Sequence, residues 1–190
     1  MVRWEPGTPE RLQEAALELF AVHGFEQTTA TAIARSVGLT ERTFFRHFAD
    51  KREVLFYGQD RFVQAFLTGI EAAPRDAAPL EIVASALRSV AAFFPDDRRS
   101  SSRKRQDVIN HNPALQERER HKFASLATTL ADALRARGVD ELPATLAAQS
   151  GTTVFEVAFT QWIREGEQRS LADITVDVLR ELRNLSTTTG

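Results

Sequence analysis

The chain has 190 residues, 43% of them hydrophobic and 26% charged, with a formal net charge of −2, which suits one large or two small globular domains. It has no apolar run long enough to span a bilayer and no cysteine, so a membrane-spanning helix, disulfides and thiolate metal sites are excluded. The N-terminal sequence MVRWEPGTPE lacks the apolar core of a signal peptide, and we expect a cytoplasmic protein.

The first predicted element is a helix with Thr8 as its N-cap and Pro9 in the first helical position. Gly24 ends this helix, and Phe25 is placed for the hydrophobic contact that usually follows such an end. Strand signals are scarce, so the expected fold class is all-α. Apolar residues recur at intervals of three and four, as on the buried face of a helix: Leu12, Ala15, Ala16, Leu19 and Phe20.

Two short helices follow, separated by a glycine turn. Thr29 is predicted to cap the first, which Gly38 stops, and Thr40 is predicted to cap the second. Phe44 and Phe48, one turn apart on the second helix, face the interior. This arrangement predicts a helix-turn-helix, in which the first helix braces the second and the second lies in the major groove of DNA.

Positive charge is concentrated in the same segment. Residues 28–52 contain two acidic residues and five basic ones, which gives a net charge of +3 in a chain that is slightly acidic overall. A DNA-binding protein of this composition has to collect its basic side chains on one surface, so the sorted charge favours a local DNA-binding patch. The five basic residues are Arg35, Arg42, Arg46, Lys51 and Arg52.

The rest of the chain is predicted to be helical as well. Asp50 begins a capping box that opens one long helix through Ile70, and residues 72–79 form a connector. The polar, basic stretch 96–105 is either a loop or the start of a helix. Further helices, which bring the total to about nine, are expected over residues 80–94, 112–138, 143–166 and 170–182.

The stretch TTATAIARSVGLTERTFFRHFADKREVL resembles the TetR family of bacterial one-component repressors, and the likeness reaches from Leu12 to about Leu55. Beyond that point the likeness is one of layout, a longer helical domain that ends in two helices suited to dimerisation. ERTFFRHF together with the later HNPAL segment resembles an actinobacterial subgroup often linked to acyl-CoA-like ligands. The resemblance implies a homodimeric repressor that a small-molecule effector releases from double-stranded, palindromic operator DNA.

We therefore predict three segments. Residues 1–49 form a three-helix helix-turn-helix domain that binds DNA. Residues 50–185 form a helical effector-binding and dimerisation domain. Residues 186–190 form a disordered tail.

The second short helix is the predicted recognition helix. Arg42 is the candidate for a bidentate contact to guanine, and Thr43 for a contact to a thymine methyl group. Arg46 and His47 are expected to hold phosphates rather than bases. Glu41 either accepts a hydrogen bond from a cytosine amine or complements the helix dipole, and we favour the second.

Contacts to the DNA backbone are expected on either side of this helix. Thr31 before it and Lys51 after it would clamp phosphates, and Thr29 belongs to the same predicted surface. Thr40 is expected to be a helix cap first and a DNA contact second. The family usually has tyrosine at position 45, with a hydroxyl that commonly reaches a phosphate. Phe45 lacks this hydroxyl, although it can pack along sugars or a thymine methyl group.

The resemblance also implies an effector pocket in the longer domain. Core packing is the commoner role for large apolar residues at helical spacing. The basic run over residues 98–105 either meets the phosphates of a CoA-like ligand or, as is commoner for such runs, forms a solvated or mobile loop. The histidines are scattered, so no metal or cofactor is expected. The candidate pocket residues are Phe62, Phe66, Phe93, Phe94, Phe123, Phe159 and Trp162.

A homodimer is expected because one short recognition helix makes few base contacts, and two copies on a near-palindrome supply the missing specificity. The predicted interface residues either contact their copies or face their own core, and the sequence leaves both open. No paired catalytic carboxylates, nucleophile triad or glycine-rich phosphate loop argues for an enzyme; the alternative function is a helical protein-interaction adaptor. The predicted interface residues are Val154, Phe155, Leu171, Ile174, Val178 and Leu182.

Overall fold

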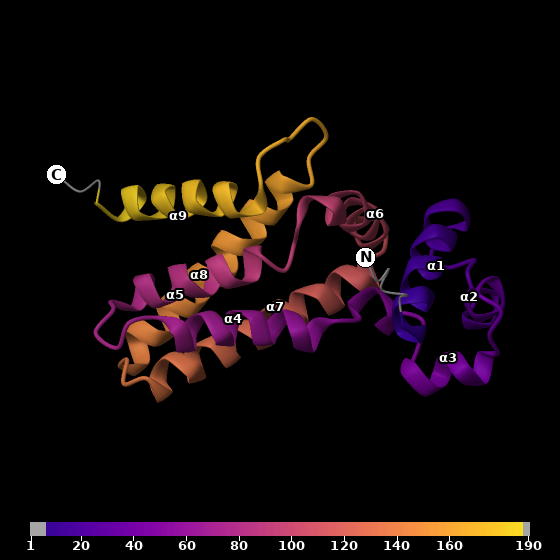
Figure 1. The fold of residues 1–190 in the computed structure, drawn as a ribbon, viewed down its shortest axis with the longest axis horizontal. Coiled ribbons are helices and arrows are strands. Elements are labelled where there is room, and N and C mark those ends of the chain that lie inside the picture. Colours follow the sequence, from indigo (N-terminus) through magenta and orange to yellow (C-terminus); the bar gives the residue numbers. More distant parts are fainter. Residues whose placement is uncertain (1–6, 188–190) are drawn as a thin grey trace, which may run out of the picture. The chain divides into compact units, whose positions relative to one another are not determined.

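The computed structural model describes residues 7–187, and this range is all-helical, as predicted, with nine α-helices and two short 3-10 helices (Figure 1). None of these helices is long and apolar enough to cross a membrane. In chain order the elements are α1 (Thr8–His23), α2 (Ala30–Ser36), α3 (Glu41–His47), η1 (Glu53–Phe56), α4 (Gln59–Ala72), α5 (Pro79–Ala91), η2 (Asp96–Arg98), α6 (Arg99–Asn110), α7 (Pro113–Ala136), α8 (Glu141–Trp162) and α9 (Leu171–Thr187).

The chain forms two compact units, which are not simple halves of the sequence. The first contains the chain up to Gln59 together with Ser101–Glu117, and the second contains Asp60–Ser100 and the chain from Arg118 onward. Residues 101–117 join the first unit because Val108, Ile109 and Leu115 are buried in the same hydrophobic cluster as the helix-turn-helix. The predicted domains, residues 1–49 and 50–185, follow the chain order, and their boundary stays a prediction.

In the first unit, α1 begins one residue earlier than predicted. Gly7 is its N-cap, Pro9 lies in its first turn, and the side chain of Thr8 makes no capping hydrogen bond. The predicted end is confirmed, since Gly24 is the C-cap and the Phe20 and Phe25 rings lie 5.0 Å apart. These contacts fix the turn that leads into α2.

The caps of the two short helices are confirmed. Thr29 Oγ1 accepts a hydrogen bond from Ala32 N at 3.1 Å, and Thr40 Oγ1 accepts one from Thr43 N at 3.2 Å. Gly38 has φ +73°, a left-handed conformation that suits glycine, and so it lets the chain turn tightly between the helices. The helix-turn-helix geometry therefore follows from two threonines and one glycine.

The long helix predicted to begin at Asp50 is wrong in its first part. Asp50 does accept hydrogen bonds from the backbone N–H groups of Arg52 and Glu53, at 2.7 and 3.2 Å. The hydrogen bond from the Arg52 side chain, more than any other contact, lowers the pKa of Asp50. The turn nevertheless closes only η1, because Gly58, with φ +86°, interrupts the helix before α4 begins.

In the second unit, α5, α8 and α9 contact one another in pairs, and α4 and α7 contribute to the same hydrophobic core (Figure 1). The predicted connector between α4 and α5 is confirmed, and residues 96–105 form η2 and the start of α6 rather than a loop. α8 begins at Glu141, two residues before the predicted start at Pro143. α9 extends to Thr187, two residues into the predicted tail; residues 188–190 lie outside the described range.

Ser170 caps α9 as predicted. Its Oγ accepts a hydrogen bond from Asp173 N at 3.1 Å and donates one to the Asp173 carboxylate at 2.7 Å. This reciprocal arrangement satisfies a backbone N–H group in the first turn of the helix.

Gly69→Ala is expected to lower the free energy of unfolding by about 1–3 kcal/mol, because α4 and α5 meet at this glycine. A Cβ atom there would lie 2.5 Å from Ala86 Cα and 2.6 Å from the Ser85 carbonyl oxygen, and neither backbone atom can move independently of its helix. Gly151→Ala is the matched control, since its Cβ would meet a side-chain methyl of Val83 at 2.7 Å. Urea denaturation checks the order, and an equal or larger loss in the control would contradict this account of the packing.

Candidate DNA-binding surface and aromatic core

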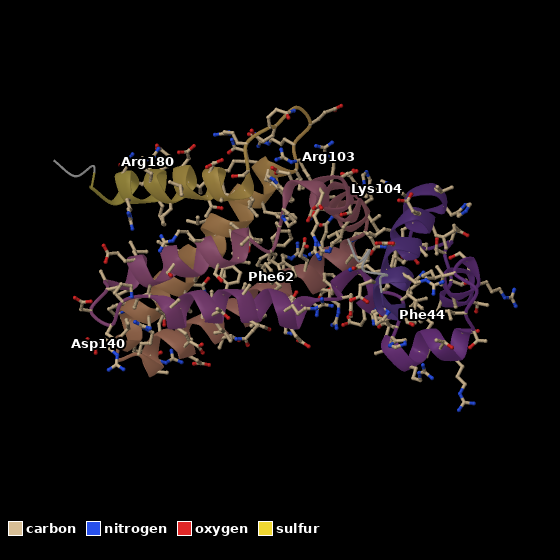
Figure 2. All side chains as sticks on the ribbon, viewed as in Figure 1. Phe44, Phe62, Arg103, Lys104, Asp140 and Arg180 are labelled. Carbon is tan, nitrogen blue, oxygen red and sulfur yellow. The ribbon has the colours of Figure 1, made fainter. Side chains whose placement is uncertain are left out.

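The recognition helix α3 has one buried and one exposed side. Phe44 is fully buried and Phe48 is 4% exposed, so this side fixes the helix to the first unit (Figure 2). Within the described residues, no hydrogen bond or ion pair engages Arg42 or Arg46. Their guanidinium groups are therefore available for a ligand. The exposed side chains of α3 are Glu41, Arg42, Phe45, Arg46 and His47.

A hydrogen bond connects the two short helices at the edge of this surface. Thr31 Oγ1, in α2, donates to Glu41 Oε2, in α3, at 2.6 Å. The contact fixes the Glu41 carboxylate and uses the hydroxyl proton of Thr31. It also gives Glu41 a bracing role that neither of the two sequence interpretations included, and the phosphate contact of Thr31 stays a prediction.

The threonines at the helix starts are engaged with each other and with the backbone. Besides its cap, Thr40 Oγ1 lies 3.0 Å from Thr43 Oγ1, within hydrogen-bonding distance. The Thr43 side chain is half-buried, whereas Thr29 and Thr40 are exposed. The capping role predicted for Thr40 is confirmed, and the DNA contacts of all three threonines stay predictions.

Lys51 lies between the recognition helix and the turn that links α1 to α2. Its ammonium group donates to the carbonyl oxygens of Phe25 at 2.8 Å, Glu26 at 3.3 Å and Thr28 at 3.2 Å, and it lies 4.3 Å from the centre of the Phe25 ring. These contacts account for all three of its N–H donors. The predicted phosphate contact stays a prediction, and the structure adds a bracing role that the charge pattern did not reveal.

Lys51→Met is expected to lower the free energy of unfolding by about 1–3 kcal/mol, because carbonyl groups of the turn lose a charged donor. The displaced turn precedes α2, so affinity for all DNA sequences should fall by a similar factor. Arg52→Met is the neighbouring control: Arg52 pairs with Asp50 across an exposed contact and should affect stability less. Calorimetry of both variants measures the difference, and an unchanged Lys51→Met protein would contradict the bracing role.

Charge at the surface is distributed differently from the sequence count. Lys51 and Arg52 are engaged with protein groups, whereas Arg35, in α2, is exposed and has no partner among the described residues. Arg35 therefore joins Arg42 and Arg46 as a candidate phosphate contact. It had been counted in the basic segment but not among the predicted contacts, because helical spacing alone does not show which side of α2 is exposed.

The predicted pocket residues lie together in the second unit. Phe62 contacts Phe66 and Phe94 at ring-centre distances of 5.2 and 6.0 Å, and Phe123 at 6.4 Å (Figure 2). Phe94 continues the set to Phe93, Phe159 and Trp162. We call these seven residues and Phe155 the aromatic core: Phe62, Phe66, Phe93, Phe94, Phe123, Phe155, Phe159 and Trp162.

Phe155 was predicted at the dimer interface, but it lies at the centre of the aromatic core. It is 3% exposed and contacts the rings of Phe62, Phe66, Phe94, Phe123 and Phe159 at distances of 5.1 to 6.2 Å. Val154, Leu171 and Ile174 are also buried in their own core, and Val178 and Leu182 pack against it half-buried. The core interpretation of these six residues is therefore the one that the chain's own packing supports.

Apolar side chains on the outer faces of α8 and α9 remain exposed instead. Val157 is 48% exposed on α8, and Val176 is 50% exposed on α9. Leu142 and Leu146, near the start of α8, and Leu185, near the end of α9, are also exposed. Periodicity could not separate these outer faces from the inner ones because α8 carries apolar residues all around.

Trp162 connects the aromatic core to the start of α6. Its indole Nε1–H donates to Asp96 Oδ1 at 3.2 Å, and the same oxygen accepts from Arg99 Nη2 at 2.5 Å. The Arg99 hydrogen bond, followed by that of Trp162, lowers the pKa of Asp96. Arg99 also stacks on the Trp162 ring and donates to the carbonyl oxygens of Glu167 and Arg169.

The basic run over residues 98–105 is thus engaged with protein groups. Arg98 stacks on Phe93, Lys104 pairs with Glu18 at 2.6 Å, and Arg105 donates to the Leu55 carbonyl oxygen at 2.8 Å. The solvated-loop interpretation is wrong, because these contacts hold the run as a helix. Within the described residues, no group of His, Asp and Glu side chains is arranged to hold a metal ion.

A buried helix face, a capped glycine turn and two unpaired arginines on an exposed helix are the features of a helix-turn-helix DNA-binding regulator. Residues 12–57 match the family model of bacterial regulatory proteins of the tetR family, and residues 77–186 match the MftR C-terminal domain. The chain belongs to the TetR family of transcriptional regulators, as the sequence resemblance implied, and this is a family of regulators rather than enzymes.

Relatives and solved structures agree with this assignment. The chain is 42% identical to the HTH-type regulator TcmR of Streptomyces glaucescens over 83 residues, 44% of this chain but only 37% of TcmR. It is 29% identical over 168 residues to the putative mycofactocin biosynthesis regulator MftR of Mycobacterium tuberculosis, 83% of this chain and 81% of the relative. The crystal structure of FadR from Bacillus subtilis with stearoyl-CoA shares the fold, with a TM-score of 0.63 and 18% identity over 90% of this chain and 96% of FadR.

Proposed function

We propose that the protein is a homodimeric repressor that binds a palindromic operator and is released from it by a small hydrophobic effector. The observation that carries the proposal is the exposed side of α3, where Arg42 and Arg46 have no protein partner while Phe44 fixes the helix from behind. Two such helices related by a two-fold axis would read two half-sites about one helical turn of DNA apart.

The outer faces of α8 and α9 are the proposed dimer interface. Val157 and Val176 are exposed there, and burying such side chains against a second copy stabilises the assembly by removing apolar surface from water. A two-fold interface uses the same patch on both copies, so one surface is sufficient. The buried residues first considered for this role would support the interface from within.

The aromatic core is the proposed effector-responsive region. Its rings would accept an acyl chain or another apolar group after rearrangement, and the FadR structure with stearoyl-CoA supports an acyl-CoA as the first compound to test. Trp162 connects this core through Asp96 and Arg99 to α6, whose later residues belong to the unit that holds α3. Movement of α6 would then alter the DNA-binding unit.

Arg42→Ala is expected to remove discrimination at one base pair of each half-site, with a loss of about 1–3 kcal/mol for the preferred base. Arg46→Ala is the matched control on the same helix and should weaken all sequences about equally, as a phosphate contact does. The operator is first recovered by selection from random duplexes, and both variants are then titrated against its single-base changes. An unchanged base preference in Arg42→Ala would show that the proposed residue roles are wrong.

The effector proposal has a separate test. Stearoyl-CoA should raise the unfolding temperature and displace the selected operator, because a ligand that prefers the DNA-free conformation shifts both equilibria. Coenzyme A without an acyl chain is the control and should do neither. If neither compound changes unfolding or DNA binding, the effector is not an acyl-CoA.

A further inference from the structure

Phe45 is an apolar side chain on a surface that is otherwise polar. It is 49% exposed, and its exposed neighbours on α3 are Glu41, Arg42, Arg46 and His47. Val22, on α1, is the other large hydrophobic residue that is exposed among the described residues of this unit. Phe45 therefore marks one apolar spot within the surface that is proposed to enter the major groove.

The ring of Phe45 is held in place rather than free to rotate away. It lies edge-on to Phe44, with ring centres 5.5 Å apart and planes at 84°. Phe44 itself is fully buried and contacts the Phe48 ring at 5.3 Å. Such edge-to-face contacts are favourable, so one side of the Phe45 ring packs on a fixed partner while the other stays in solvent.

The chemistry of the groove limits what this ring can recognise. Base edges in the major groove present hydrogen-bond donors and acceptors, together with one apolar group, the C5 methyl of thymine. Phe45 has no donor for a phosphate or a base acceptor. Thr43, the other candidate for this contact, is half-buried and lies within hydrogen-bonding distance of Thr40.

We propose that Phe45 is a specificity-determining residue that contacts the 5-methyl group of a thymine in each operator half-site. The inference rests on the proposed function, in that α3 must lie in the major groove. It adds a base preference that comes from apolar contact alone and that complements the hydrogen-bonding preference of Arg42.

Replacing thymine by deoxyuridine removes the methyl group and leaves base pairing intact. Each thymine of the selected operator is replaced in turn, and affinity is measured for the wild-type protein and Phe45→Ala. For the thymine that Phe45 contacts, the wild type should lose about four-fold in affinity per half-site, corresponding to one buried methyl group, or about 15-fold when both half-sites are changed. Phe45→Ala should bind the thymine and uracil duplexes equally.

His47→Ala is the matched control, because it removes another exposed ring of α3 and should retain the wild-type loss at the same thymine. Phe45→Leu keeps an apolar side chain and should retain part of it. The inference is overturned if no thymine shows a methyl effect that disappears in Phe45→Ala. Failure of the proposed function gives a different result, since selection would then enrich no duplex at all.

Discussion

Phe44→Ala should lower the free energy of unfolding of the DNA-binding unit by about 3–5 kcal/mol and abolish specific DNA binding. Phe44 is fully buried and contacts Phe48 from the inner side of α3, so truncation leaves a cavity directly beneath the recognition helix. The adjacent residue is the matched control. Phe45 is 49% exposed, and Phe45→Ala should change stability by no more than about 0.5 kcal/mol.

Urea denaturation followed by circular dichroism measures both variants. The neighbouring phenylalanines have the same size and lie on the same helix, so any difference reports which side of the helix faces the core. Similar losses for the two variants would mean that α3 is not packed through Phe44, and the exposed arginine surface would then lose its structural basis.

Phe155→Ala should be comparably damaging, with a loss of about 3–5 kcal/mol in the second unit. Its ring contacts five other rings of the aromatic core, so a large cavity would remain at the centre. Because Phe155 is buried in its own subunit, the effect should show as unfolding rather than as simple dissociation of folded subunits.

Val176→Asp is the contrasting variant. Val176 is 50% exposed on α9, and a carboxylate there should weaken the dimer while leaving the subunit folded. Analytical ultracentrifugation combined with thermal unfolding distinguishes the two cases. If Phe155→Ala produced a stable folded monomer while Val176→Asp remained dimeric, the interface would use Phe155, as first predicted from the sequence.

Local signals allowed the helix-turn-helix to be predicted closely. Thr29 and Thr40 cap their helices, and Gly38 turns the chain between them, because each of these effects depends only on residues a few positions apart. The same local signals placed the ends of α7 and α9 near Gly138 and Ser170. Where one residue dominates the backbone geometry, sequence is sufficient.

Contacts between distant residues could not be predicted in this way. Lys51 reaches carbonyl groups of the turn at Phe25, and Asn112, in the HNPAL segment, donates to Glu26 at 2.8 Å. Neither pairing leaves a periodic signal. For the same reason, the apolar pattern of α8 did not show that Phe155 faces inward while Val157 faces outward.

DNA binding as a function of salt tests the central claim most directly. The selected operator is titrated by fluorescence anisotropy with the wild-type protein and with a variant that carries Arg42→Ala and Arg46→Ala. We expect wild-type affinity to fall steeply as salt rises, and the variant to bind more weakly with a shallower slope, because each lost phosphate contact reduces the number of counterions released. A wild-type protein that binds no duplex at low ionic strength, or a variant that binds as the wild type does, would contradict the assignment of α3 as the recognition helix.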